Sequence, residues 1–312
     1  MPDRLVVSLP DAILPQYLDR LAEPVPADAV EWVTWPVDGP PPAPKLDIVV
    51  LPYIPSGSGR LNWLAEPEIA LVQSQSIGYD NVGAALPPGL VYANASSVHE
   101  TATAELAIAL ALASQRGLDV FARNAVDGQW RPRRLPSLAD RTVLILGYGG
   151  VGQAVEKRLA GFEVARVIRV ASTARESVAG HVHGVDELPT LLPEADVVVI
   201  GTPLTDATRG LVGAQELALL RDDSLVVNVA RGAVLQTDAV LAEAGRLRFA
   251  LDVTDPEPLP AEHPLWHAPG VLISPHVGGA ASAMEPRMAR LLRRQIGHLL
   301  AGEEPENIVL RS

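Results

Sequence analysis

The sequence predicts an α/β protein with mainly parallel sheets, and three observations support this prediction. Short apolar runs alternate with helix-like segments from residue 142 onward. One of these runs leads through a glycine-rich turn into a helical segment. The 312 residues are enough for two domains, each with its own hydrophobic core. Continuous apolar strands separated by helices are typical of a parallel sheet that is covered on both faces.

The alternating pattern fills the C-terminal part of the chain. Its strand-like runs are Val143–Leu146, Val164–Val170, Val197–Ile200, Leu225–Val229, Phe249–Val253 and Val271–Ile273. Each run is three to seven residues long and rich in branched apolar side chains, as expected for buried strands. A final helix is expected over about 282–300.

The N-terminal part differs, because prolines interrupt residues 1–95. Three strands are expected there, at Leu5–Leu9, Ile48–Leu51 and Ile69–Val72. Ser97 and Glu100 have the spacing of a capping box, so a helix is expected from Ser97 to about Arg116. This Ala/Leu-rich helix suits either a buried core or a subunit interface, because apolar residues occur on nearly all its faces.

Composition and charge exclude several classes of function. The formal net charge is −12, from 25 basic and 37 acidic residues, so we expect no nucleic-acid partner. No apolar run reaches the roughly 20 residues of a membrane span, and the N-terminus lacks a signal-peptide pattern. The absence of cysteine excludes disulfides and thiolate zinc sites, and we expect no metal. A cytoplasmic enzyme without a membrane partner fits these features.

The glycine-rich turn has the G-x-G-x-x-G pattern of dinucleotide-binding sites, formed by Gly147, Gly149 and Gly152. A buried strand precedes it and a helix follows it, which is the context that this pattern requires. Gly147 would permit a tight turn, Gly149 would let a pyrophosphate approach the backbone, and Gly152 would allow close helix–strand packing. The helix N-terminus would face the phosphates.

Three of the predicted strands are followed by residues suited to catalysis. Arg231, Glu257 and His276 each come shortly after a strand, and ligands of parallel sheets bind at the carboxyl ends of the strands. These residues fit a keto-acid reductase. Hydride addition to a ketone builds negative charge on its oxygen, where an imidazolium can deliver a proton. A nearby carboxylate favours that charged form, and an arginine can bind the substrate carboxylate in a bidentate manner.

The sequence resembles the D-isomer-specific 2-hydroxyacid dehydrogenase family over nearly its whole length. Several motifs match in order: Ser76-Ile-Gly-Tyr-Asp-Asn81, Gly128-Gln-Trp130, Leu146-Gly-Tyr-Gly-Gly-Val-Gly-Gln153, Thr202-Pro-Leu-Thr205, and the segments around the arginine, glutamate and histidine. The resemblance implies two Rossmann-like lobes with parallel sheets and the active site in the interdomain cleft. It places a substrate domain at 1–96, completed by 282–312, and a dinucleotide-binding domain at 97–281.

The resemblance also implies roles for individual residues. His276 would be the acid/base, Glu257 its partner, and Arg231 would bind the substrate carboxylate. The expected substrate-binding residues are Ile54, Gly78, Arg231 and Trp130. The expected cofactor-binding residues are Gly147, Gly149, Gly150, Val151, Gly152, Ser172, Thr173, Arg175, Thr202, Val229, Ala230, Asp252 and Gly278, with Asp252 holding the nicotinamide carboxamide. Trp130 would line a partner subunit's pocket or pack in the arm of a homodimer.

The strand after the glycine-rich turn bears on the choice between NADP and NAD. Sites specific for NAD carry a carboxylate at the tip of this strand, and this sequence has none there. Ser172 and Thr173 occupy the tip and Arg175 follows, which suits a 2′-phosphate and favours NADP(H), although a site that uses both cofactors stays open. Arg169 lies within the strand and can point away.

The expected substrate is a small molecule. We expect a small unphosphorylated 2-keto acid such as glyoxylate or hydroxypyruvate. Arg60 is the one basic residue near the expected substrate loop, so a phosphorylated substrate, as in phosphoglycerate dehydrogenase, is an alternative. A non-catalytic nucleotide-binding regulator on the same fold is a further alternative, because such relatives often keep the catalytic residues.

Overall fold

The chain folds into two compact units. The computed structural model describes residues 4–53, 58–80 and 82–312. One unit comprises Met1–His99 and Ala280–Ser312, and the other comprises Glu100–Gly279. The first unit is therefore discontinuous in sequence, and the second is a single stretch of chain.

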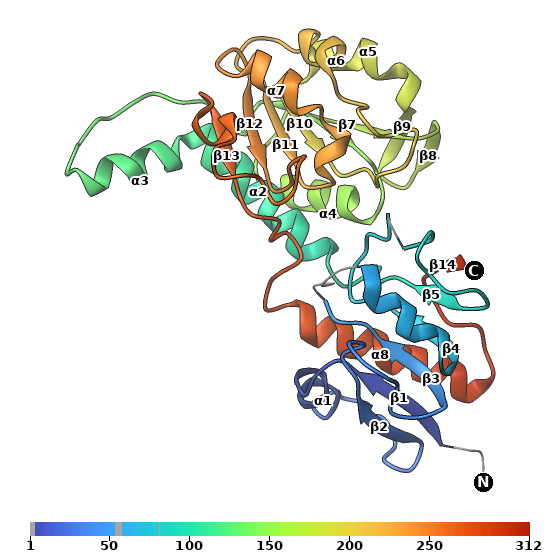
Figure 1. Cartoon of the computed structure of the whole chain (residues 1–312). Coiled ribbons are helices and arrows are strands. Elements are labelled where there is room, and N and C mark those ends of the chain that lie inside the picture. The colour runs from blue at the N-terminus through green and yellow to red at the C-terminus, as the bar shows by residue number, and fades with distance from the viewer. Residues whose placement is uncertain (1–3, 54–57, 81) are drawn as a thin grey trace. The chain divides into compact units, whose positions relative to one another are not determined.

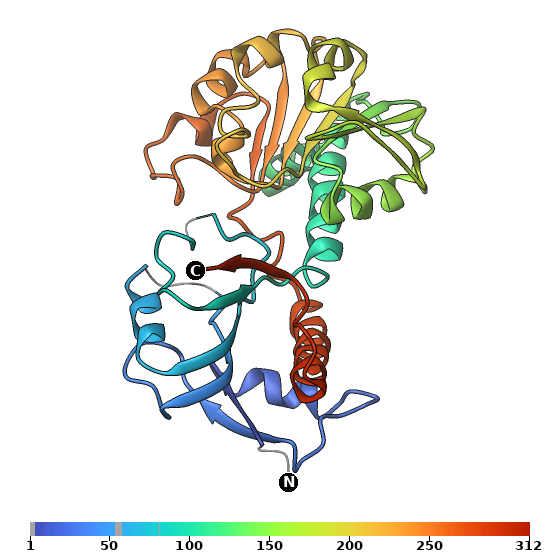
Figure 2. The same cartoon turned by 90° about the vertical axis from the view of Figure 1, so that its right-hand side faces the viewer.

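The first unit contains a six-stranded sheet in the order β14-β5-β4-β3-β1-β2. Its strands are β1 (Leu5–Leu9), β2 (Val30–Thr34), β3 (Lys45–Val50), β4 (Glu68–Gln73), β5 (Val91–Ala93) and β14 (Ile308–Arg311). All neighbouring strands are parallel except the last pair, in which β14 runs antiparallel to β5. Figure 2 shows this C-terminal strand beside β5.

Helices cover this sheet because its strands carry apolar side chains on both faces. The helical elements are α1 (Ile13–Leu18), a 3-10 helix (Ser58–Ala65) and α8 (Met284–Ala301). One core joins fully buried Met288 and Ile296 of α8 to Val7 and Ile48 of the strands. Figure 1 shows this contact of blue strands with the red helix, so opposite ends of the chain share one core. A second core packs around Leu46.

The second unit contains an eight-stranded sheet in the order β13-β12-β11-β10-β6-β7-β9-β8. Its strands are β6 (Thr142–Leu146), β7 (Arg166–Ala171), β8 (Arg175–Ser177), β9 (Gly180–Gly184), β10 (Val197–Ile200), β11 (Leu225–Asn228), β12 (Arg248–Leu251) and β13 (Val271–Ile273). All pairs are parallel except β8 with β9, which lie at one edge of the sheet (Figure 1).

Helices lie on both faces of this sheet, as its continuous apolar strands require. They are α2 (Glu100–Arg116), α4 (Gly150–Leu159), α5 (Leu188–Leu191), α6 (Ala214–Ala218) and α7 (Thr237–Glu243), with short 3-10 turns at Val185–Glu187, Leu192–Glu194, Gly232–Val234 and Pro264–His267. Helix α3 (Leu118–Val126) follows α2 and has no buried residue. Ile145 and Val199 face a core with α2 and α4. Leu144 and Val198 face the opposite core with α5 and α7. Successive strand residues therefore supply two cores.

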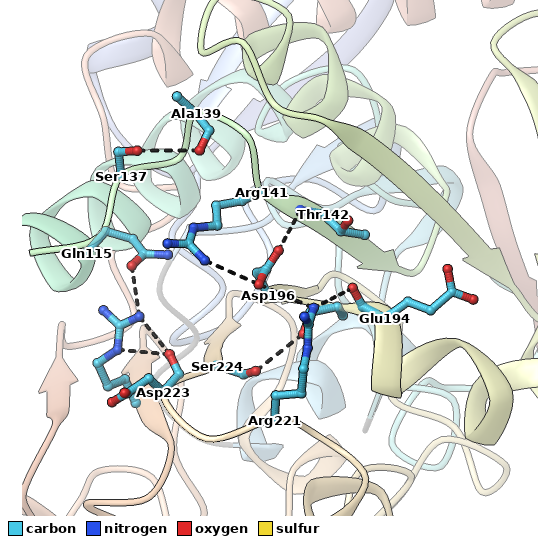
Figure 3. A network of polar contacts seen from close by, with 12 residues as sticks. Gln115, Ser137, Ala139, Arg141, Thr142, Glu194, Asp196, Arg221, Asp223 and Ser224 are labelled. Carbon is cyan, nitrogen blue, oxygen red and sulfur yellow. Dashed lines mark hydrogen bonds and ion pairs between the residues drawn. The ribbon is translucent and has the colours of Figure 1, made fainter.

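A polar network closes the amino-terminal end of this sheet (Figure 3). The Asp196 carboxylate, just before β10, accepts hydrogen bonds from the Thr142 backbone amide at 2.8 Å and from Arg141 at 3.4 Å. Arg221 also donates to Asp196, at 3.3 Å. One carboxylate therefore ties together the entries to β6 and β10 and the turn before β11, on the end of the sheet away from the carboxyl termini of the strands.

The α/β class with two mainly parallel sheets is confirmed, but one expected helix start is wrong. The helix expected from Ser97 begins at Glu100. Ser97 has a φ of 79°, in the left-handed region, whereas a capping residue takes an extended conformation. Its hydroxyl instead accepts a hydrogen bond from Arg294 at 3.3 Å. Among the described residues, no helix combines the length and the apolar character needed to cross a membrane.

Candidate active site

The glycine-rich turn joins β6 to α4 with the close contacts expected of it. Gly147 has a φ of 105°, and a Cβ there would lie 2.5 Å from the backbone nitrogen of Thr202. At Gly152 a Cβ would lie 2.3 Å from the Gly147 carbonyl oxygen. A Cβ at Gly149 would meet nothing within 4 Å. Two glycines are thus required by packing, and the third leaves open space above the start of α4.

This open space fits a dinucleotide pyrophosphate. Gly149 precedes α4 without a side-chain cap, so the helix N-terminus is available to an anion. Strands β6 and β10 are neighbours although β7 to β9 separate them in sequence, so the turn lies where the strand order reverses. Beside it, the hydroxyl of Thr202 is buried and has no hydrogen-bond partner among the described residues. A cofactor oxygen would satisfy this hydroxyl.

His276 and Glu257 form the pair that the sequence predicted. Nδ1 of His276 lies 2.5 Å from Oε1 of Glu257. The two residues come from the segments after β13 and β12, which are neighbouring strands. Their side chains remain 45% and 40% exposed, so the imidazole can reach a substrate.

Electrostatics favour the doubly charged form of this pair. The hydrogen bond that His276 donates to Glu257 is the main factor that raises the pKa of His276, against the opposing effects of burial and of the Arg231 charge. For Glu257, burial raises the pKa, but the hydrogen bond and charge of His276 outweigh it, so the pKa of Glu257 is lowered. The pair is therefore suited to hold a proton on the imidazole, as a proton donor requires.

Asp252 fixes the turn that carries His276. Its carboxylate is 2% exposed and accepts hydrogen bonds from the Ser274 hydroxyl at 2.6 Å and from the amides of Val277 and Gly278 at 2.9 and 2.8 Å. Its carbonyl oxygen accepts from the His276 amide at 2.7 Å. His276 has a φ of 53°, a left-handed conformation that is unfavourable for this residue type. These bonds hold the backbone in that conformation.

Arg231 follows β11 and is positioned by its neighbours. The amide side chain of Asn228, 1% exposed, accepts from the Ala230 amide at 3.0 Å and donates to the Arg231 carbonyl at 3.1 Å. A Cβ on Gly232 would lie 1.9 Å from the carbonyl oxygen of Thr254, so only glycine allows this approach. The arginine is thereby brought beside the segment of Glu257, and its charge acts on both Glu257 and His276.

The tip of β7 presents the two hydroxyls and the guanidinium that the sequence indicated. Ser172, Thr173 and Arg175 are all exposed. The Arg175 guanidinium donates to the carbonyl oxygen of Tyr148 in the glycine-rich turn at 2.9 Å. Arg169 is instead paired with Glu156 of α4 and lies over the ring of Tyr148. Arg175 is therefore placed next to the turn, and Arg169 is engaged elsewhere.

The structure describes all of the expected substrate-binding residues except one. Ile54 lies outside the described residues. Gly78 follows β4 in the first unit, where the preceding Ile77 carbonyl accepts from the Asn94 side chain at 2.9 Å. Trp130 follows α3 in the second unit and is 93% exposed.

The remaining expected cofactor residues lie at or near the carboxyl ends of the strands. Val229 and Ala230 follow β11 and are 8% and 7% exposed, and Gly278 bonds to Asp252. Sequence reasoning did not assign roles to Asn228 and Ser274. Both are polar residues at the carboxyl ends of strands, in the same motifs as Arg231 and His276. This position in the sequence could have identified them as candidate site residues.

Comparison with known proteins identifies the family of the chain. The model of the D-isomer specific 2-hydroxyacid dehydrogenase NAD-binding domain matches residues 108–278. A glyoxylate reductase from Pyrococcus horikoshii is 32% identical over 260 residues, covering 78% of this chain and 77% of that protein. A glyoxylate reductase from Thermococcus litoralis is 31% identical over 262 residues, with coverage of 78% and 77%.

Solved structures show the same architecture. An NADPH-dependent glyoxylate/hydroxypyruvate reductase from Sinorhizobium meliloti, in complex with NADP and sulfate, matches with a TM-score of 0.79, 25% identity and 99% coverage of both chains. A D-isomer specific 2-hydroxyacid dehydrogenase from Xanthobacter autotrophicus, in complex with NADPH and MES, matches with a TM-score of 0.80, 26% identity and coverage of 99% and 98%. The chain therefore belongs to the D-isomer specific 2-hydroxyacid dehydrogenase family of oxidoreductases.

Proposed function

We propose that the protein reduces a small 2-keto acid to the D-2-hydroxy acid, with His276 as the acid/base, Glu257 as its partner and Arg231 as the carboxylate-binding residue. The observation that carries this proposal is the 2.5 Å contact of His276 with Glu257, within the electrostatic reach of Arg231. A nicotinamide dinucleotide would supply the hydride when bound. The glycine-rich turn and Thr202 would hold it.

The chain's own groups account for the rest of the chemistry. Protonated His276 would donate from Nε2 to the carbonyl oxygen while Nδ1 keeps its hydrogen bond to Glu257. The carboxylate of Glu257 stabilises the imidazolium before the transfer. Arg231 would bind the substrate carboxylate and attract electron density at the adjacent carbonyl. In the oxidative direction the neutral imidazole would accept the proton.

The names of the relatives and the hydrogen bond of Arg60 favour an unphosphorylated substrate. The curated relatives are glyoxylate reductases, and one structural relative reduces glyoxylate and hydroxypyruvate. The Arg60 guanidinium donates to the carbonyl oxygen of Pro36 at 2.8 Å. This hydrogen bond gives Arg60 a partner within the protein in place of a substrate phosphate. Steady-state kcat/KM should therefore be higher for glyoxylate or hydroxypyruvate than for 3-phosphohydroxypyruvate. Absence of turnover with all three would refute the proposed reaction.

NADP(H) is the proposed cofactor, because Arg175 lies beside the glycine-rich turn and the tip of β7 lacks a carboxylate. Two hydroxyls and a guanidinium can bind a 2′-phosphate, which a carboxylate would repel. We expect kcat/KM to be higher with NADPH than with NADH. Arg175→Ala should reduce this ratio, whereas Arg166→Ala, which removes an exposed arginine from the opposite end of β7, should leave it unchanged. A wild-type preference for NADH would refute the assignment.

A homodimer is proposed from the arm formed by α3 and residues 127–134, which projects from its unit (Figure 1). No residue of α3 is buried, and the large apolar side chains Leu118, Val126 and Trp130 are 53%, 87% and 93% exposed. A cavity of about 460 Å³ lies between the helix and the segment around Trp130. A second copy of the chain would cover these apolar groups. Sedimentation at micromolar concentration should give a dimer; a monomer of 33.1 kDa would contradict this proposal.

A further inference from the structure

Two histidines project from one edge of the eight-stranded sheet. His181 and His183 are two residues apart in β9, so their side chains share a face, while Val182 between them is fully buried on the other. The imidazole rings meet edge to face with centroids 4.6 Å apart. Glu187 lies at the end of the 3-10 turn that follows β9.

Each histidine is oriented by a carboxylate. Nδ1 of His181 lies 2.7 Å from Oε1 of Glu176, its cross-strand neighbour on β8. Nδ1 of His183 lies 2.8 Å from Oε2 of Glu187, whose other oxygen accepts from the Gly184 amide at 2.9 Å. These hydrogen bonds therefore orient both imidazoles and the Glu187 carboxylate.

We propose that His181, His183 and Glu187 bind a divalent transition-metal ion, of which Zn²⁺ is the simplest probe. One ligand atom from each of the three residues lies within 4.8 Å of the other two. Two imidazoles and a carboxylate form a donor set suited to Zn²⁺, with an open position for water. The contact of Glu176 with His181 matches the carboxylate–histidine–metal arrangement that fixes the ring of a ligand.

The proposed metal site is separate from the catalytic residues. Strand β9 lies near one edge of the sheet, and β12 and β13, which precede Glu257 and His276, lie at the opposite edge. The bound ion would tie β9 to the turn after it, and β9 pairs with β8, which carries Arg175. The sequence prediction of no metal rested on the absence of cysteine and did not weigh the His-x-His pattern.

Isothermal titration with Zn²⁺ tests the proposal. A group that only orients a metal ligand contributes about 10–100-fold in affinity, so Glu176→Gln should weaken binding by about that factor. The double variant His181→Ala/His183→Ala removes two ligands and should weaken binding more than about 100-fold. His298→Ala is the matched control, because His298 also pairs with a carboxylate, 3.0 Å from Glu303, but belongs to no potential metal-ligating group among the described residues. It should bind as the wild type does.

Two further readouts separate a metal site from general surface binding. Co²⁺ should give visible d–d absorption in the wild type that the double variant loses, while circular dichroism shows both proteins to be folded. Affinity should fall as the pH is lowered, because protons compete with the metal ion for its ligands. Absence of Zn²⁺ binding in the wild type, or equal affinity in the wild type and the double variant, would overturn the proposal.

Discussion

Asp252 offers the sharpest test of how His276 is held in position. Its buried carboxylate accepts three hydrogen bonds from the turn around His276. Asp252→Ala would leave a hydroxyl and two amides without this acceptor. A hydrogen bond to a charged group contributes about 1.5–3 kcal/mol. Because the three bonds share one carboxylate, their losses would not add fully, and we expect the free energy of unfolding to fall by about 3–5 kcal/mol.

Turnover should fall for the same reason. Without the carboxylate, the left-handed backbone at His276 loses the bonds that oppose its unfavourable conformation. A displacement of the imidazole by about 1 Å would lower kcat about 100-fold. Asp252→Asn keeps the size and one acceptor oxygen, so its losses should be smaller; it also provides a folded variant if the alanine variant does not fold.

Three measurements on each variant distinguish the roles of Asp252. Urea unfolding reports stability, kcat with glyoxylate reports the position of His276, and the Kd of NADPH reports any direct contact with the cofactor. Glu262→Ala, which removes an exposed carboxylate from the segment between β12 and β13, should leave all three unchanged. An Asp252→Ala variant with wild-type stability and kcat would refute the reasoning.

Further predictions concern the His276–Glu257 pair and the opposite end of the sheet. His276→Ala should lower kcat about 10²–10⁴-fold with little change in cofactor affinity, because it removes the proton donor; a nearly unchanged kcat would remove the assignment. Glu257→Gln should move the alkaline limb of the pH profile for keto-acid reduction to lower pH, because Glu257 raises the pKa of His276 and reduction needs protonated imidazole; a limb that stays in place would contradict the pairing. Asp196→Ala should lower the free energy of unfolding by about 1–3 kcal/mol through the unpaired Thr142 amide, with kcat unchanged, as urea titration and turnover would show.

The sequence predicted the glycine-rich turn and the contact of His276 with Glu257, because both follow from the order of buried strands and from the position of ligands at their carboxyl ends. It did not predict the role of Asp252, because that role depends on a left-handed turn at His276 that no pattern encodes. The catalytic assignment of these residues stays a prediction.

The sequence pattern did not predict several strands. Strands β8 and β9 (Arg-Glu-Ser and Gly-His-Val-His-Gly) are polar, because they lie at an edge and bury little apolar surface. The C-terminal strand β14 pairs with β5, more than 200 residues earlier in the chain, and no local pattern reports such a contact. The start of α2 was misplaced because the spacing of Ser97 and Glu100 does not reveal the φ of 79° at Ser97.

The polar residues at the two ends of the second unit's sheet differ in what they stabilise. At the amino-terminal end, Asp196 accepts hydrogen bonds from three donors, and these bonds hold the starts of neighbouring strands together. At the carboxyl end, Asp252 supports a strained turn while the His276–Glu257 pair stays about 40% exposed. Exposure is needed for a substrate to reach the imidazole, and it also weakens the pair through solvent screening. A buried carboxylate that braces the backbone behind the pair compensates for this, since it orders His276 without covering it.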